Sequence, residues 1–160
     1  MSGVAQGLQI LHAANIIVGS LHENNIFAIN RERGIIGDFD FTKDGAQRSS
    51  SSSVSFPHLR APELTMGHPA SMSSDMYAYG CILLWLYTRN KEFSFKDDGT
   101  ISLHGLGLDS KLEYLLSHLL CSRDRMQAEN VKSHEYFQMT EERVNPMSDG
   151  ETQHIPADFA

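Results

Sequence analysis

The sequence has no long hydrophobic run, no basic stripe and few cysteines, and each shortage excludes a class of protein. The longest apolar stretch, CILLWLY, is far too short to span a membrane. With a net charge of −7 and no clustered basic residues, the chain is not expected to bind nucleic acid. Its two cysteines, Cys81 and Cys121, lie in apolar runs, which indicates buried thiols in a reducing compartment. The first residues also lack the features of a signal peptide, so we expect a cytoplasmic protein.

Helical periodicity is the strongest positive signal. The stretch SMSSDMYAYGCILLWLYTR is apolar on nearly every face, which predicts a central buried helix capped by Ser73 or Ser74. Residues 2–14 predict a first helix that ends at Asn15. The segment LDSKLEYLLSHLLCSRD predicts an amphipathic helix capped by Asp109 or Ser110, and MQAENVKSHEYF predicts one shorter helix after it.

Three short apolar segments read as β-strands. They are NIIV, NIFAIN and GIIGDF, and the polar link NRERG predicts a hairpin between the last two. Two or three short strands are not stable alone, so they must pack on helices. The sequence therefore predicts an α+β fold that is mainly α-helical. The Ser- and Gly-rich stretch from residue 41 to residue 58 predicts an exposed, mobile loop, and residues 140–160 predict a disordered tail after a domain spanning 1–139.

The order of four motifs resembles the C-terminal lobe of a protein kinase. VGSLHENNIF resembles the catalytic loop, GDFDF the Asp-Phe-Gly motif, RAPEL the end of the activation segment, and SSDMYAYGCILLWLY the central helix of that lobe. The resemblance covers roughly residues 3–137, and it makes residues 38–63 an activation-segment-like loop. More narrowly, GSLHENNIFAINRERGIIGDFDFTK is similar to the Tudor-domain-bearing serine/threonine kinases of animal germ cells, although no Tudor module is present.

The resemblance implies roles for particular residues. Asn25 and Asp38 stand where the family holds Mg²⁺ against the phosphates of ATP, so they would form a relict metal and cofactor site. Asp75 would accept hydrogen bonds from backbone N–H groups of the catalytic loop. Glu63 would form a buried ion pair with Arg125, with Arg123 as the rival partner.

The same resemblance implies that two catalytic side chains of the family are replaced in this sequence. Ser20 occupies the position of the aspartate that accepts the proton of the substrate hydroxyl. His22 occupies the position of the lysine that would neutralise the γ-phosphate. A serine is a very poor base at neutral pH, and loss of a general base typically costs about 10²–10⁴ in rate. Asp40 replaces the glycine of Asp-Phe-Gly, and Asp40 or His22 as a substitute base remains an alternative.

The Gly-rich loop and the phosphate-binding lysine of the upper lobe have no counterpart in the sequence, which begins near the start of the lower lobe. ATP binds between two lobes, so nucleotide binding is expected to be weak. Apolar surface is expected at the mouth of the site, from Ile16, Phe27, Ile29 and Phe39. We therefore expect a truncated kinase-like domain, a pseudokinase that works through protein partners. The alternative is an ATP-dependent serine/threonine protein kinase of which this chain is a fragment or short isoform.

Overall fold

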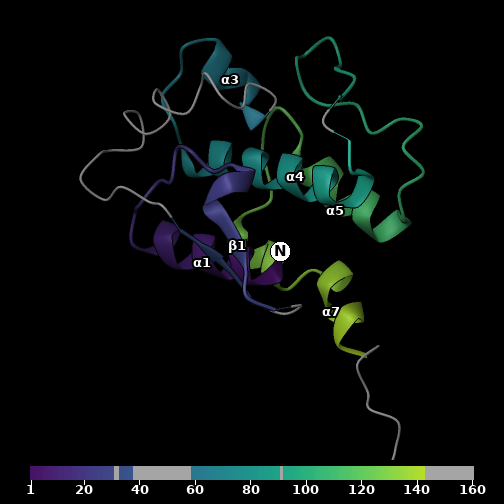
Figure 1. The fold of residues 1–160 in the computed structure, drawn as a ribbon. Coiled ribbons are helices and arrows are strands. Elements are labelled where there is room, and N and C mark those ends of the chain that lie inside the picture. Colours follow the sequence, from purple (N-terminus) through teal and green to yellow (C-terminus); the bar gives the residue numbers. More distant parts are fainter. Residues whose placement is uncertain (31–32, 38–58, 91, 143–160) are drawn as a thin grey trace, which may run out of the picture.

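The computed structural model describes residues 1–30, 33–37, 59–90 and 92–142, with side chains up to Gln138. Within these ranges helices predominate and one small antiparallel sheet is present (Figure 1). The expected class, mainly α-helical with a short hairpin, is confirmed. None of the described helices has both the length and the apolar character that crossing a membrane would require.

The first helix, α1 (Ser2–Ala13), buries Val4, Ala5 and Leu8. It ends as the sequence predicts, because Asn15 adopts the left-handed conformation with φ of 58°. The next residues, 16–18, do not form the strand that NIIV suggested. Their apolar side chains favour a strand, but the N–H group of Val18 is bound by a side chain from the middle of the domain rather than by a neighbouring strand.

The hairpin consists of β1 (Ile26–Ala28) and β2 (Gly34–Ile36), preceded by the 3-10 turn η1 (Glu23–Asn25). The two strands are antiparallel, and Phe27 lies opposite Ile35. The predicted hairpin is therefore present. The sheet packs on α1 through β2, and so it has the helical support that two short strands need.

Helix α4 (Met72–Thr88) is the predicted central helix, and eleven consecutive residues, from Ser74 to Leu84, are buried. Its N-cap is Ser71 rather than Ser73 or Ser74. Ser71 has the extended backbone that a cap requires, and its Oγ accepts the N–H of Ser74 at 3.1 Å while Ser74 Oγ accepts the N–H of Ser71 at 2.9 Å. The prediction of the cap was therefore wrong by two or three residues.

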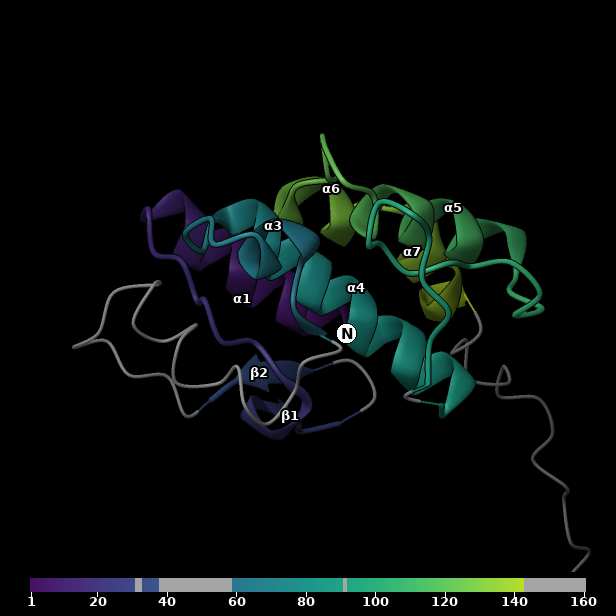
Figure 2. The same ribbon diagram turned by 90° about the horizontal axis from the view of Figure 1, so that it is seen from above.

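Helix α5 (Ser110–Leu119) packs against α4 and is capped by Asp109, whose carboxylate accepts the N–H of Lys111. Figure 2 shows α5 on the side of α4 away from the hairpin. The two helices approach closely at Gly80, because a Cβ built there would lie 2.9 Å from Cβ of Leu119. Glycine at this position therefore sets the distance between the two helices.

The C-terminal part of the described chain holds two helices where the sequence suggested one. They are α6 (Ala128–Lys132), which packs on α1, and α7 (Glu135–Glu142), which packs on α5. The break falls at Ser133 and His134, where the ring Nδ1 of His134 accepts the N–H of Tyr136. Helix α7 continues to Glu142, past the expected start of the tail at residue 140, and the rest of the tail, 143–160, lies outside the described residues.

Candidate functional site

The loop that carries Ser20 is held by one buried carboxylate. Asp75, in the first turn of α4, is 2% exposed. One of its oxygens accepts the N–H of Gly19 and the other the N–H of Val18, each at 2.8 Å. Charged hydrogen bonds of this kind are among the stronger ones in proteins. The carboxylate of Asp75 therefore fixes the shape of the loop through two main-chain N–H groups, as the resemblance implied.

His12 is a third partner of this carboxylate that the sequence analysis missed. Its Nε2 lies 2.9 Å from Oδ2 of Asp75, and its side chain is 10% exposed. A histidine in the last turn of α1, just before the loop, was the available signal, but nothing in the sequence links it to a residue 63 positions away. With His12, the buried carboxylate receives three hydrogen bonds, so it is well satisfied.

Asn25 closes the other side of the loop. Its side chain is buried, and its Nδ2 donates to the carbonyl of Ser20 at 3.0 Å. Its Oδ1 accepts the N–H of His22 at 2.9 Å, so one of the two lone pairs of this oxygen is occupied. The carbonyl of Asn25 accepts the N–H of Gly37 at 2.8 Å, which brings the end of the hairpin beside the loop.

Ser20 and His22, the two residues predicted to replace family catalytic groups, lie on this loop. The side chain of His22 caps η1, because its Nδ1 accepts the N–H of Asn24 at 3.2 Å. This bond turns the ring towards its own loop. Ser20 is half-buried. The N–H of Gly19 before it is bound by Asp75, and its own carbonyl is bound by Asn25. The main chain of the loop is thus held on both sides of residue 20, whose side chain is a hydroxyl.

The described residues fit a magnesium ion poorly on their own. They contain no group of three His, Cys, Asp or Glu side chains placed to hold a metal. Asn25 offers one amide oxygen, which already accepts a hydrogen bond. Asp38, the other predicted ligand, and Asp40 lie outside the described residues, one and three positions beyond Gly37. Because Mg²⁺ requires several oxygen ligands, we derive no catalytic step through it.

Glu63 and Arg125 form the ion pair that was expected, and Arg123 takes no part in it. Helix α3 (Pro62–Thr65) presents Glu63, whose two carboxylate oxygens are bonded by Nη1 and Nη2 of Arg125, the second at 2.9 Å. The guanidinium also donates from Nε to the carbonyl of Cys121 at 2.7 Å and lies 4.8 Å from the ring centre of Tyr77. This pair ties the end of the activation-segment-like loop to the chain before α6.

The electrostatics of Glu63 follow from these contacts. Burial raises the pKa of the Glu63 carboxyl, but the hydrogen bonds and the charge of Arg125, together with a backbone N–H, act in the opposite direction. The net result is a pKa below its ordinary value, which shows that the ionised pair is favoured in the fold.

The buried carboxylate of Asp75 that holds a loop and the Arg125–Glu63 pair are the two contacts that the resemblance to the C-terminal lobe of a protein kinase implied. The chain matches the protein kinase domain family over residues 1–137, and it belongs to that family. Members of the family use ATP and Mg²⁺.

Among individual proteins, the chain is 51% identical over 155 residues to serine/threonine-protein kinase 31 of Homo sapiens. That alignment covers 96% of this chain and 15% of the relative. It is 47% identical over 162 residues to serine/threonine-protein kinase 31 of Mus musculus, with 99% and 16% covered. Serine/threonine-protein kinase A-Raf of Mus musculus is 38% identical over 97 residues, with 56% and 16% covered. The chain thus spans about one sixth of the length of these relatives.

Proposed function

We propose that this chain is a catalytically impaired kinase-like domain that acts by binding another protein. The observation that carries the proposal is Ser20 in a loop whose shape is held by Asp75 and Asn25. With the loop in place, the missing element is the base itself. A serine hydroxyl has no charge with which to orient a substrate hydroxyl and cannot accept its proton near neutral pH.

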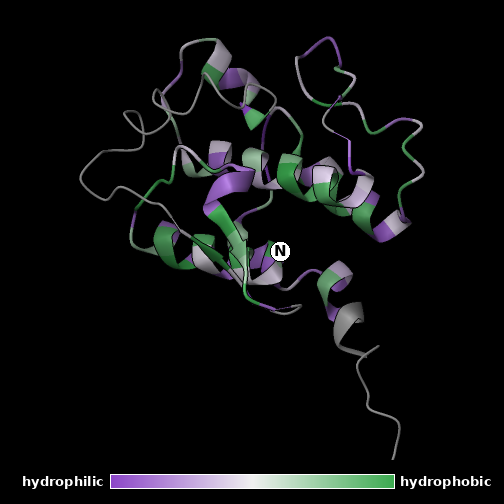
Figure 3. Ribbon diagram, in the orientation of Figure 1, coloured by the Kyte–Doolittle hydropathy of each residue, from purple (hydrophilic) through white to green (hydrophobic). Residues whose placement is uncertain are grey.

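An exposed apolar surface on the hairpin supports the binding part of the proposal. We call it the hairpin patch; it consists of Phe27, Ile29 and Ile35, whose exposed fractions are 47%, 57% and 42%. Figure 3 shows strand β1 in the green of apolar residues. Of the other residues expected at this mouth, Ile16 is half-buried and Phe39 lies outside the described residues. Contiguous apolar side chains that remain exposed are typical of contact surfaces for another polypeptide.

The catalytic part is tested by phosphate transfer from radiolabelled ATP to a generic protein substrate. The wild-type chain is compared with Asp38→Asn, which removes the predicted metal ligand and measures the background from contaminating kinases. We expect the two to be indistinguishable. Wild-type transfer clearly above the Asp38→Asn background would overturn the proposal. The double variant Ser20→Asp with His22→Lys restores both family side chains and shows whether their loss alone limits the chain.

The binding part is tested with Phe27→Thr combined with Ile35→Thr, since two threonines opposite each other suit an antiparallel pair. We expect this variant to lose co-purifying protein from an extract while its melting temperature stays near that of the wild type, because both side chains are exposed. Met66→Thr is the matched control, since Met66 is an exposed apolar residue outside the hairpin patch. Equal recovery of partners by all three proteins would contradict a role for the patch.

The alternative function is ATP-dependent phosphoryl transfer to serine or threonine in proteins, with this chain as one part of the enzyme. The feature that favours it is Asn25, whose side chain is buried and positioned against the loop. A titration with Mg²⁺–ATP followed by thermal unfolding separates the two functions, because a ligand of the folded state raises its melting temperature. A saturable rise that Asp38→Asn abolishes would favour the alternative.

A further inference from the structure

A cavity of about 580 Å³ lies away from the loop of Ser20, between α1, the start of α4 and the segment 124–129 that leads into α6. Its volume falls in the range of small-molecule sites, about 300–1,000 Å³. Most of its wall is helical and packed, since α1 contacts α6 directly, and residues 124–127 of the wall are irregular chain. The cavity is therefore a preformed feature of the domain, separate from the hairpin patch.

Three methionine side chains line this cavity. Met76 is buried at 2% exposure, and Met72 and Met126 are half-buried. They come from two elements far apart in the sequence, so their grouping is a property of the fold. Thioether sulfurs make favourable contacts with aromatic rings, and flexible methionines adapt to the shape of a ring. The lining thus favours an aromatic body.

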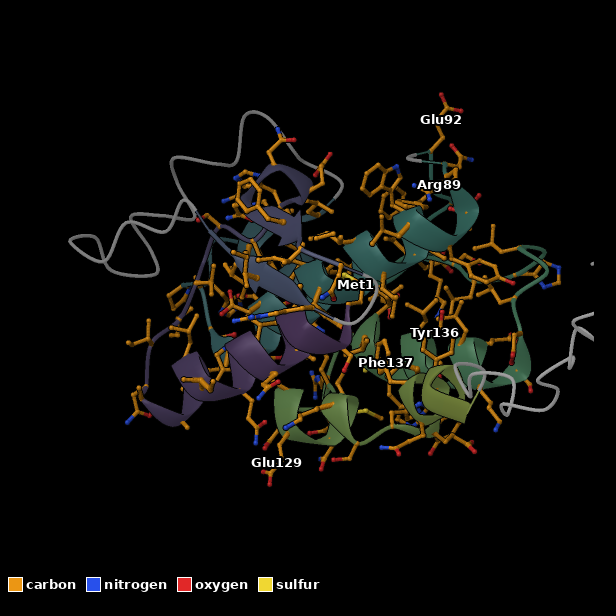
Figure 4. All side chains as sticks on the ribbon, turned by 60° about the horizontal axis from the view of Figure 1, so that its bottom comes forward. Met1, Arg89, Glu92, Glu129, Tyr136 and Phe137 are labelled. Atoms are coloured by element: carbon orange, nitrogen blue, oxygen red, sulfur yellow. The ribbon has the colours of Figure 1, made fainter. Side chains whose placement is uncertain are left out.

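The charges around the cavity favour a cation. The two basic groups in the lining are already engaged, since Arg125 binds Glu63 and His12 binds Asp75. The remaining charged groups are the carboxylates of Asp124 and Glu129, both exposed, and neither forms an ion pair with any residue that the structure describes. Figure 4 shows Glu129 at the outer edge of its helix. The rim is therefore negative, and the floor offers no unpaired positive charge.

We propose that this cavity binds an aromatic cation, with the ring among Met72, Met76 and Met126 and the positive group at the carboxylates of the rim. The site is also connected to the loop of Ser20. His12 lines the cavity and donates to Asp75, which in turn accepts the N–H groups of Val18 and Gly19. A ligand that moves His12 therefore acts on the loop through two hydrogen-bonded steps. This inference stands whether or not the chain transfers phosphate.

The test uses the full chain with ¹³C-labelled methionine methyl groups and two probes of matched shape, tryptamine and its neutral analogue tryptophol. The chain has seven methionines, and we expect saturable ring-current shifts at Met72, Met76 and Met126 but none at Met66, which lies outside the cavity. Tryptamine should bind about two- to five-fold more tightly than tryptophol, a gain within the range of exposed ion pairs. Absence of shifts at the three methionines, or equal affinity for both probes, would overturn the proposal.

Two further measurements test the rim and the connection. The double variant Asp124→Asn with Glu129→Gln should lower the affinity for tryptamine to that for tryptophol. Asparagine suits the left-handed backbone of residue 124, where φ is 54°, so the variant is expected to fold and its melting temperature checks this. Tryptamine should also shift the amide signals of Val18 and Gly19. Methionine shifts without amide shifts would refute the connection to the loop.

Discussion

Arg125 and Glu63 are 62 residues apart in the sequence and form a two-pronged ion pair in which the arginine side chain is 1% exposed and the glutamate side chain 27% exposed. The guanidinium has further bonds to the carbonyls of Cys121 and Ser73. The pair therefore fixes the position of α3 relative to the end of α5. Both charged groups of the pair are mostly buried.

Removal of one partner should be costly. We expect Glu63→Gln to lower the free energy of unfolding by about 3–5 kcal/mol, because the charge of Arg125 stays buried without its counter-ion. Denaturant unfolding measures the effect. Arg123→Ala is the control, since Arg123 is exposed and its side chain takes no part in the pair; its variant should differ from the wild type by less than about 0.5 kcal/mol. Equal losses in the two variants would contradict the assignment.

The ion pair should also make stability depend on acid pH. The pKa of Glu63 lies below its ordinary value of 4.5 in the fold, so the folded state binds fewer protons than the unfolded state in this range. The contribution of the pair is complete above about pH 4.5 and is lost as the pH falls through the lowered pKa of the folded state. Melting temperatures between pH 6 and pH 3 should therefore fall more steeply for the wild type than for Glu63→Gln. Parallel curves would show that the carboxyl is not stabilised in its ionised form.

Asp75→Asn should loosen the loop that carries Ser20. An amide can accept hydrogen bonds with one oxygen only, and it carries no charge, so at least one N–H of Val18 or Gly19 loses its partner. We expect a loss of about 2–4 kcal/mol in unfolding free energy and faster amide exchange at both residues. Asp109→Asn is the matched control, because asparagine caps a helix as well as aspartate does. Unchanged exchange at Val18 and Gly19 would show that the carboxylate does not hold the loop.

Gly80→Ala should destabilise the contact between α4 and α5. The added methyl group would lie 2.9 Å from Cβ of Leu119, so the helices must separate or the side chains must shift. Overpacking of this kind costs about 1–3 kcal/mol. Gly7→Ala on α1 serves as the opposite case, since its methyl group would meet Ile36 at an ordinary 3.5 Å, and alanine favours a helix by up to about 1 kcal/mol. Thermal unfolding of both variants should therefore give shifts of opposite sign.

Periodicity predicted α4, α5 and the hairpin because each depends on side chains close together in the sequence. The strand expected at NIIV was wrong because the N–H of Val18 is bound by Asp75, 57 residues further along the chain, and the N–H of Ile16 by the carbonyl of Leu11 in α1. The contact of His12 with Asp75 could not be read from the sequence for the same reason. The break between α6 and α7 depends on the ring of His134, a local feature that apolar spacing does not report. The pairing of Glu63 with Arg125 came only from the resemblance to kinases, and the magnesium role of Asp38 stays a prediction.

Asp75 binds the loop through the N–H groups of Val18 and Gly19, and Asn25 binds it through the carbonyl of Ser20, so neither depends on the side chain at position 20. These bonds therefore tolerate another side chain of similar size at that position. A serine and an aspartate can thus occupy the same framework, so the chemistry at this position is separable from the architecture that surrounds it.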